Sequence, residues 1–266
     1  MTATKKRPIV RAQPAAPTLD RAVFVRPIAH RGLHDRSKGR VENTEAAFRA
    51  AIERGYGIEC DLQAASDDVP MVFHDAKLER LMDAAGQIRG YTAKQLATFH
   101  YAGSQQRMLR FAEFLELVDG RVPLLVEVKS DGRKLRTAFL ANVAMLARRY
   151  KGPIALMSFD SNIVSELAER AARVPRGAIV GSKQFLSELW RKSTTREANT
   201  GTRILGAPAG DISFLAVDVK LAAAARRSLV RHGRDLPLFT WTVRTLRQRA
   251  TAARWADAPI FEGYEP

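Results

Sequence analysis

The feature that most constrains the fold is an alternation of two kinds of segment from residue 26 onward. Short runs rich in β-branched residues alternate with longer alanine-rich runs whose apolar residues recur with helical spacing. Eight runs are expected to be strands: residues 27–30, 57–63, 122–129, 154–159, 177–181, 214–219, 237–243 and 259–262. Strands that alternate with crossover helices form parallel sheets. The sequence therefore predicts an α/β protein, either a (β/α)₈ TIM barrel or a doubly wound open sheet.

One segment breaks the alternation. After the expected strand at residues 57–63, Asp67 and Asp68 indicate a turn, and residues 70–74 form another strand-like run with no helix between. This spacing predicts a hairpin that rises above the sheet and returns. The barrel is thus expected to carry a hairpin after its second strand.

Two further features complete the predicted domain plan. Residues 76–110 form a small irregular insertion with one short helix, which Thr92 and Gln95 would begin as a capping box. Asn43 stands just before the first crossover helix, and its side chain is expected to cap that helix. Residues 26–266 are therefore interpreted as one TIM-barrel domain.

Residues 1–25 differ in composition from the rest of the chain. They are interpreted as a disordered basic leader, because polar residues and prolines interrupt what would be the apolar stretch of a signal peptide. The later apolar runs are too short to span a membrane. The single cysteine, Cys60, cannot form an internal disulfide and is expected in the core, which fits a reducing compartment. We therefore expect a cytoplasmic protein.

The chain is strongly basic, with 43 Lys and Arg against 28 Asp and Glu and a formal net charge of +15. The basic residues are spread along the chain and lack the interleaved aromatic residues on which single-strand binders stack bases. Nucleic acid is therefore not the expected partner. The charge instead favours attraction to anionic phosphates and a weak association with anionic membrane surfaces.

Acidic residues stand at the carboxyl ends of two expected strands, where a barrel places its active site. Glu59 and Asp61 are two positions apart, so they share one face of a strand while Cys60 points to the other. Adjacent buried carboxylates repel each other unless a cation compensates. With Glu127 they would complete an oxygen site of the kind that a divalent cation such as Mg²⁺ or Ca²⁺ uses.

Histidines and basic residues are expected around this acidic group. His30 and Arg31 end the first strand, and the returning hairpin brings His74 back across from the second. Lys129 shares a face with Glu127, although a plain ion pair between them is an alternative. The set suits displacement at a phosphoryl centre, because the cations hold non-bridging oxygens while one histidine removes a proton and the other protonates the departing alkoxide. The remaining histidines are expected to be surface or structural residues: His34, His100 and His232.

In this set of residues the sequence resembles the glycerophosphodiester phosphodiesterases. The matching motifs follow one another over nearly the whole chain: His30-Arg31-Gly32, Glu42-Asn43-Thr44, Glu59-x-Asp61, Phe73-His74-Asp75 with Leu78 and Arg80, Glu127-x-Lys129, Ser158-Phe159 and Trp241-Thr242-Val243. The resemblance implies a metal-dependent hydrolase with a (β/α)₈ barrel. It also implies that the substrates are deacylated phospholipids and that the products are sn-glycerol 3-phosphate and an alcohol.

The resemblance further implies roles for individual residues. It assigns metal binding to Glu59, Asp61 and Glu127, acid–base catalysis to His30 and His74, and phosphate binding to Arg31 and Lys129. Glu42 would orient Arg31 or approach the metal, and Trp241 would wall the glycerol pocket or belong to the core. Three places depart from the usual family pattern. Asp68 stands where the family commonly has a turn glycine, and Arg244 stands where an asparagine often follows Trp-Thr-Val. Phe261-Glu262-Gly263 stands where a Thr-Asp pair often ends the last strand.

Two other functions stay open at this point. A phospholipase D-like hydrolysis of lysophospholipids would need an apolar channel, which Phe99, Tyr101, Met108 and Leu109 of the insertion would supply unless they pack against the barrel. A non-catalytic barrel that binds phosphate or membranes would use the positive charge. Binding alone, however, would not need both histidines and all three acids.

Overall fold

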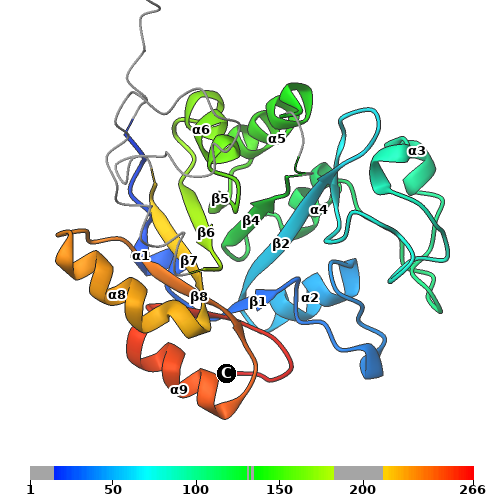
Figure 1. Cartoon of the computed structure of the whole chain (residues 1–266). Coiled ribbons are helices and arrows are strands. Elements are labelled where there is room, and N and C mark those ends of the chain that lie inside the picture. The colour runs from blue at the N-terminus through cyan, green and yellow to red at the C-terminus, as the bar shows by residue number, and fades with distance from the viewer. Residues whose placement is uncertain (1–14, 131, 133–134, 183–211) are drawn as a thin grey trace, which may run out of the picture.

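The computed structural model describes residues 15–130, 132, 135–182 and 212–266. Within these residues eight parallel strands close into a barrel, because β1 pairs with both β2 and β9 (Figure 1). The strands are β1 (Ile28–His30), β2 (Gly57–Ala64), β4 (Leu124–Val128), β5 (Ile154–Ser158), β6 (Arg176–Val180), β7 (Phe214–Asp218), β8 (Leu238–Val243) and β9 (Ala258–Phe261). The predicted (β/α)₈ TIM barrel is confirmed, and the closed sheet excludes the doubly wound alternative.

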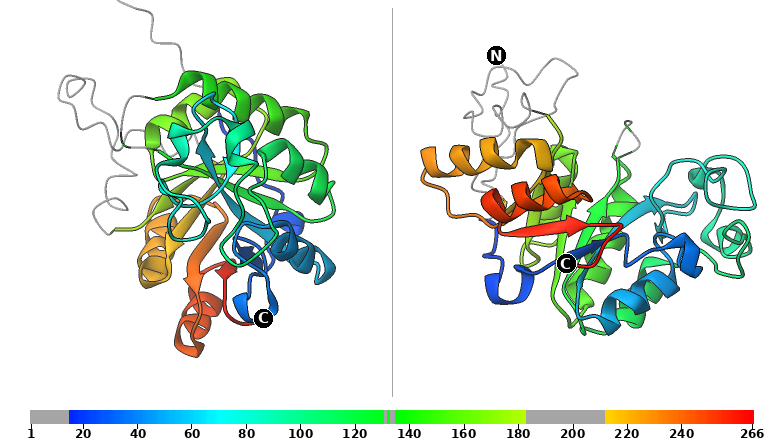
Figure 2. Two further views of the ribbon diagram at one scale, coloured as in Figure 1. Left: turned by 90° about the vertical axis from the view of Figure 1, so that its right-hand side faces the viewer. Right: turned by 90° about the horizontal axis from the view of Figure 1, so that it is seen from below.

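Helices cover the outside of the barrel (Figures 1 and 2). They are α2 (Glu45–Glu53), α4 (Phe111–Val118), α5 (Thr137–Arg149), α6 (Ser161–Arg170), α8 (Ala222–Arg231) and α9 (Leu246–Trp255). Most of them bury an apolar face that their helical periodicity creates, as α5 does with Phe139, Val143 and Ala147. Among the described helices, none combines the length and the apolar character that crossing a bilayer requires. The connection between β6 and β7 falls largely in residues 183–211, outside the described part of the chain.

Apolar side chains fill the barrel below the carboxyl ends of its strands. This interior cluster includes Ile28, Leu125, Ala155, Met157, Ile179, Phe214, Ala216, Phe239 and Ile260. Their neighbours along the strands point outward, as Leu124 and Val126 do on β4, and pack beneath the helices. Each fully buried large apolar side chain contributes about 1.5–3 kcal/mol to folding, so these two layers hold the strand ends in place.

The segment before β1 closes the amino end of the barrel. Leu19 and Phe24 are buried in the interior cluster, and the short helix α1 (Arg21–Phe24) begins at Asp20, whose carboxylate accepts a hydrogen bond from the Ala22 amide. Residues 15–25 therefore belong to the fold, which differs from the expectation that the whole of residues 1–25 is a disordered leader. Residues 1–14 of that expected leader lie outside the described residues.

The hairpin forms where the sequence predicts it. The strand β3 (Pro70–Val72) runs antiparallel to β2, with Val72 opposite Leu62. Asp68 in the turn has a positive φ of 60°, which explains why glycine would also suit this position. The hairpin returns the chain to the carboxyl end of β2, and His74 follows directly.

The insertion has a small core of its own. It contains the short 3₁₀ turn η2 (Ile88–Gly90) and the helix α3 (Ala93–Leu96), whose predicted Thr92–Gln95 capping box is present. Two further 3₁₀ turns, η1 (Arg36–Lys38) and η4 (Val219–Leu221), lie in loops elsewhere. Tyr101 and Met108 are buried in the insertion's core, Phe99 packs against it, and Leu109 packs against the main core. The suggestion that these side chains form an apolar channel is therefore wrong.

Candidate active site

Three carboxylates meet at the carboxyl end of the barrel. Glu59 and Asp61 on β2 and Glu127 on β4 are 2%, 1% and 7% exposed, and one oxygen of each lies within 4.8 Å of the others. The strand register explains this, because Asp61 lies directly opposite Glu127 while Glu59 is two residues earlier on the same face. Cys60 points away from them into the layer beneath the helices and is fully buried.

Two basic side chains balance part of this negative charge. The Nζ atom of Lys129 lies 2.8 Å from Oδ1 of Asp61 and 2.7 Å from Oε1 of Glu127, and Nε of Arg31 lies 3.3 Å from Oδ2 of Asp61. Burial raises the pKa of Glu59 and of Glu127, and the charge of Asp61 raises both further. Burial would also raise the pKa of Asp61, but Lys129 and Arg31 more than offset it and hold that pKa well below its usual range.

The donor set of this acidic group fits a hard divalent cation. All of the candidate ligand atoms are carboxylate oxygens, which Mg²⁺ and Ca²⁺ prefer. Lys129 contacts only one oxygen of Glu127, so the second oxygen of that side chain is left for a metal. Both oxygens of Asp61 already have partners, Oδ1 in Lys129 and Oδ2 in Arg31 and Asn43. Each carboxylate oxygen has more than one acceptor site, so Asp61 can still bind a cation. Because Glu59 and Glu127 have raised pKa values, a bound cation would replace protons that these carboxyls otherwise retain.

His30 ends β1 next to Glu59 on β2. Its Nδ1 lies 2.6 Å from Oε2 of Glu262, and its Nε2 lies 3.9 Å from Oε2 of Glu59. The carboxylate of Glu262 favours a proton on Nδ1, so the tautomer inferred from these partners has its lone pair on Nε2, facing the acidic group. Burial lowers the pKa of His30, and the hydrogen bond with Glu262 offsets part of that effect.

His74 has a similar arrangement and lines the same pocket as His30. Its Nδ1 lies 2.6 Å from Oδ1 of Asp75, which leaves Nε2 for a substrate. Burial lowers the pKa of His74, and the charge of Asp61 offsets part of that effect. The structure thus brings both histidines to one site, each with a carboxylate on Nδ1.

Glu42 orients Arg31 and lies outside the acidic group. Its Oε1 accepts a hydrogen bond from Nη1 of Arg31 at 2.6 Å, and Arg80 donates to both of its oxygens, at 2.8 and 2.7 Å. Arg80 also pairs with Asp75, the carboxylate that holds His74. One network of ion pairs therefore connects the insertion to two residues of the candidate site.

We expect Glu42→Gln to lower the free energy of unfolding by about 2 kcal/mol near neutral pH, with no effect in acid. Burial alone would raise the pKa of Glu42, but the hydrogen bond from Arg80 and the charge of Arg31 lower it to about 2. A carboxyl with a depressed folded-state pKa contributes stability above its unfolded pKa of about 4.3, and this stability is lost as the pH falls through the folded value.

Denaturant unfolding of wild type and Glu42→Gln at several pH values measures this difference. The two free energies should converge between about pH 4 and about pH 2. Glu45→Gln is the matched control, because Glu45 pairs with Arg49 on the exposed face of α2 and such pairs contribute only about 0.3–0.5 kcal/mol. A constant gap between wild type and Glu42→Gln down to the lowest pH would contradict the assigned network.

Two residues at the site have positions that sequence reasoning did not anticipate. Asn43 does not cap a helix as expected, because α2 begins after Thr44. It instead adopts a left-handed φ of 56°, which asparagine tolerates, and its Nδ2 donates to Oδ2 of Asp61 at 2.9 Å. Glu262 appeared only as a departure from the family pattern. Its position directly after the last strand was the available signal, since β9 lies beside β1 in a closed barrel.

His34 also lies closer to the site than expected. Its Nε2 is 3.5 Å from Oε2 of Glu262, and its side chain is 21% exposed. Arg244, another departure from the family pattern, contacts the second oxygen of Glu262 through Nε at 2.6 Å. The other two histidines lie elsewhere: His100 accepts a hydrogen bond from Arg107 in the insertion, and His232 ends α8.

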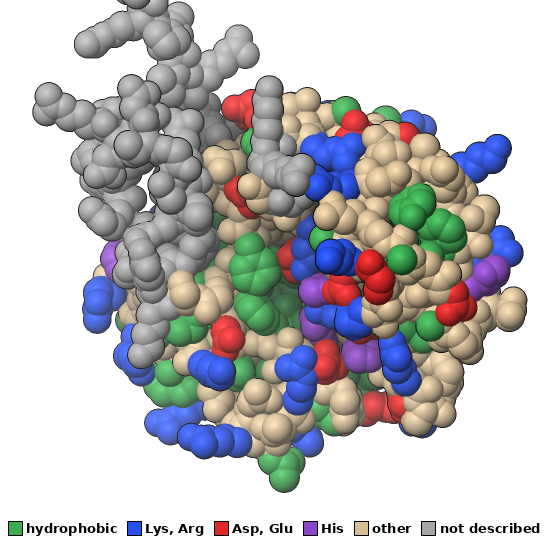
Figure 3. Space-filling model, turned by 45° about the vertical axis from the view of Figure 1, so that its right-hand side comes forward, with side chains coloured by type: hydrophobic (Ala, Val, Ile, Leu, Met, Phe, Trp, Pro, Cys, Tyr) green, Lys and Arg blue, Asp and Glu red, His purple; other side chains and the backbone are tan. Residues whose placement is uncertain are grey.

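A pocket of about 370 Å³ opens at this end of the barrel. One side of it is polar and includes both histidines, Arg31 and Lys129, whereas the other side is apolar and includes Met157, Phe159 and Trp241. In Figure 3 apolar side chains lie beside a group of histidine, basic and acidic side chains. Trp241 meets Phe159 edge to face, with 5.4 Å between ring centroids, and packs on the interior cluster. It is therefore both part of the packing and a wall of the pocket.

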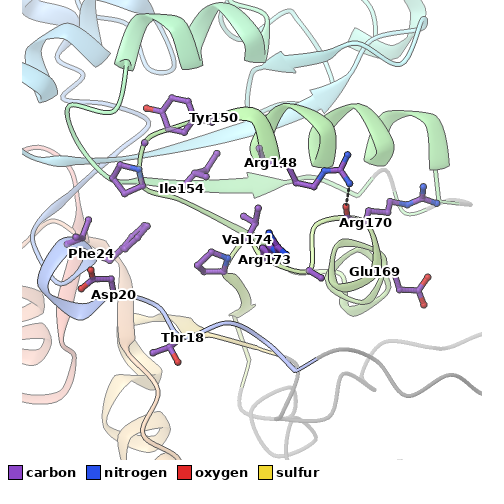
Figure 4. Close-up of a pocket in the computed structure, with 16 residues that line it drawn as sticks. Thr18, Asp20, Phe24, Arg148, Tyr150, Ile154, Glu169, Arg170, Arg173 and Val174 are labelled. Atoms are coloured by element: carbon purple, nitrogen blue, oxygen red, sulfur yellow. Dashed lines mark hydrogen bonds between the residues drawn. The ribbon is translucent and has the colours of Figure 1, made fainter.

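A larger hollow of about 720 Å³ lies at the opposite end of the barrel (Figure 4). Its lining includes Phe24, Ile154 and several arginines, and Arg148 donates to the backbone carbonyl of Arg170 at 3.2 Å. Among its described lining residues there is no histidine. Size alone would favour this hollow, but both histidines line the smaller pocket together with Glu59 and Glu127.

The fold and the site together define a (β/α)₈ barrel with an acidic pocket flanked by histidines at the carboxyl ends of its strands. Residues 30–261 match the model of the glycerophosphoryl diester phosphodiesterase family. The chain therefore belongs to that family.

Curated sequence relatives carry the same family name. The chain is 34% identical over 106 residues to glycerophosphodiester phosphodiesterase 1 of Mus musculus, a match that covers 39% of this chain and 29% of the mouse protein. It is 36% identical over 102 residues to a glycerophosphodiester phosphodiesterase of Caldanaerobacter subterraneus, covering 38% of this chain and 37% of that protein. The matched stretches thus span less than half of either relative.

Solved structures show the same fold. An Oleispira antarctica phosphodiesterase, in complex with the product sn-glycerol-3-phosphate, superposes with a TM-score of 0.70 at 19% identity and covers 92% of this chain and 93% of its own. A Parabacteroides distasonis glycerophosphodiester phosphodiesterase gives a TM-score of 0.71 at 17% identity, with 90% and 93% coverage. Both matches span the barrel almost completely.

Proposed function

We propose that the protein hydrolyses glycerophosphodiesters to sn-glycerol 3-phosphate and an alcohol, with the help of one divalent metal ion. The observation that carries this proposal is the grouping of three buried carboxylates with two histidines, each held by a carboxylate, in one pocket. Membership of the family supports it, as does the product bound to the Oleispira antarctica relative.

Glu59, Asp61 and Glu127 would hold the metal, Mg²⁺ or Ca²⁺, through carboxylate oxygens. When bound, such a cation polarises a phosphoryl oxygen and neutralises charge that develops there. Arg31 and Lys129 bind the remaining phosphate oxygens, and both line the pocket. Their own ion pairs hold the two cationic groups in position before substrate arrives, so little reorganisation is needed during the reaction.

The two histidines divide the proton transfers. Nε2 of His30 accepts the proton of the attacking oxygen as that oxygen bonds to phosphorus. Attack by water gives sn-glycerol 3-phosphate directly, whereas attack by the 2-hydroxyl of glycerol gives a cyclic phosphate that a water molecule must then open. The bond from phosphorus to the departing alcohol breaks, and Nε2 of protonated His74 gives its proton to the leaving oxygen. Exchange of protons with solvent restores both side chains. Glu262 and Asp75 keep the two rings in the orientation that these steps need.

The structure favours small glycerophosphodiesters over lysophospholipids. The insertion residues considered for an acyl channel pack in the insertion's core or against it, or against the main core. A non-catalytic phosphate-binding barrel is disfavoured, because binding alone does not require two histidines whose Nδ1 atoms are both held by carboxylates. The net charge of +15 would attract anionic substrates and support a weak association with anionic membranes.

A substrate panel tests this proposal. Purified protein is incubated with glycerophosphocholine, glycerophosphoethanolamine and lysophosphatidylcholine, first with excess chelator and then with Mg²⁺ or Ca²⁺ restored. We expect sn-glycerol 3-phosphate from the first two compounds, loss of activity in chelator and its return with metal. Full activity in excess chelator would contradict the metal's role, and faster hydrolysis of the lysolipid would favour the phospholipase D-like reaction.

A further inference from the structure

A second group of metal-ligating side chains lies next to the acidic group. His30, His34 and Glu262 each offer one ligand atom, and these atoms lie within 4.8 Å of one another. Oε2 of Glu262 is central to the group, 2.6 Å from Nδ1 of His30 and 3.5 Å from Nε2 of His34. The three side chains are 12%, 21% and 18% exposed, so the group is partly open to solvent.

The group differs from the acidic site in its chemistry. Two nitrogens and one carboxylate oxygen are the donors that Zn²⁺ and similar transition metals prefer, whereas three carboxylates suit Mg²⁺ and Ca²⁺. The Nε2 atom of His34 is buried, and its contact with Oε2 of Glu262, at 3.5 Å, is too long for a strong hydrogen bond. A metal ion at this position would give the nitrogen a closer partner.

Arg244 holds the carboxylate of Glu262 in an orientation that suits such an ion. Arg244 contacts its Oε1 through Nε at 2.6 Å, which fixes the carboxylate and leaves Oε2 toward the histidines. The positive charge of Arg244 also weakens cation binding. We therefore expect a site that fills reversibly, unlike a permanent structural zinc site.

We propose that His30, His34 and Glu262 form a second metal site, which binds a nitrogen-preferring divalent cation such as Zn²⁺ and inhibits the enzyme when filled. The inhibition rests on the role proposed above for His30, whereas the binding does not. A neutral imidazole that coordinates a metal through Nδ1 carries its remaining proton on Nε2. Nε2 then has no lone pair with which to accept a proton from the nucleophile, so His30 cannot act as the base.

His34 makes the proposal testable, because it belongs only to the second site. His34→Gln removes one nitrogen ligand and leaves His30 and Glu262 in place. His232→Gln is the matched control, a histidine substitution at the end of α8. In excess Mg²⁺, which keeps the acidic site filled, we expect wild type and both variants to have similar activity without Zn²⁺. The Zn²⁺ concentration for half-inhibition should then rise at least about 10-fold in His34→Gln only.

A spectroscopic readout separates this proposal from the proposed function. Co²⁺ bound to two nitrogens and an oxygen with a fourth ligand absorbs strongly in the visible, whereas Co²⁺ in a six-coordinate oxygen site absorbs weakly. We expect the strong absorption in wild type, His232→Gln and Glu127→Gln, and its loss in His34→Gln. This result would establish the site even if the tested diesters were not hydrolysed. Equal Co²⁺ spectra and equal Zn²⁺ inhibition in wild type and His34→Gln would overturn the proposal.

Discussion

Glu59→Gln is expected to lower kcat/KM by about 10³-fold or more and to weaken Mg²⁺ binding. Glutamine has nearly the same size as glutamate but no charge, so the change removes one of the three anionic ligands without opening a cavity. Only Asp61 and Glu127 would then remain, and the neighbouring basic side chains of Arg31 and Lys129 would nearly neutralise them. A divalent cation would therefore gain little by binding there.

The same variant should fold at least as well as wild type in the absence of metal. Burial and the charge of Asp61 raise the pKa of Glu59, so its ionised form is unfavourable in the folded protein, and a neutral amide avoids that cost. Calorimetric titration with Mg²⁺ measures the metal affinity, and thermal unfolding in chelator measures the stability without metal. Steady-state kinetics measure kcat/KM. Glu45→Gln on the exposed face of α2 is the control. Unchanged Mg²⁺ affinity in Glu59→Gln would exclude this group as the metal site.

His30→Ala and His74→Ala are both expected to lower the rate of hydrolysis, but the size of the decrease should depend on the leaving group only for His74→Ala. General acid catalysis contributes roughly 10²–10⁴-fold, or about 3–5 kcal/mol, when the leaving group is a poor one. His74 follows the returning hairpin, so we assign it to the departing alcohol, whereas His30 on β1 is assigned to the nucleophile. An aryl leaving group departs as its anion and needs little protonation.

The comparison uses glycerophosphocholine and a nitrophenyl ester of glycerol phosphate as substrates. His74→Ala should lose most of its rate on the choline ester and recover much of it on the nitrophenyl ester. His30→Ala should be impaired on both. His100→Ala is the control, because His100 lies in the insertion and pairs with Arg107. Equal losses of His74→Ala on both esters would contradict its role as the acid, and the reverse pattern would exchange the two roles.

Much of the site follows from local rules of chain geometry. Glu59 and Asp61 share a face because they are two residues apart on one strand, and parallel alignment with β4 places Glu127 beside Asp61. The turn after β2 is visible in the sequence, and so is the return of His74 toward the acids. Such inferences need only the periodicity of a strand and the position of a turn.

Other features depend on packing that local patterns do not encode. The sequence predicts a cap at Asn43, because asparagine favours helix starts, but the left-handed backbone conformation of Asn43 itself carries its side chain to Asp61. The local sequence of the insertion does not distinguish aromatic side chains that face the substrate from aromatic side chains that face the core. Their burial was decided by the apolar area that they remove from water together with the hairpin.

The sequence alone determined the order of strands and helices, the hairpin and the alternation that puts Glu59 and Asp61 on one face of their strand, because these follow from interactions between residues close in the chain. Only the tertiary structure decided that the sheet closes. Closure pairs β1 with β9 and brings Glu262 within 2.6 Å of His30, although 232 positions separate them. His34 meets the same carboxylate for that reason. Arg244 reaches it because β8 pairs with β9. Contacts between residues so distant in the chain arise from the packing of the whole barrel, since no short segment contains both partners.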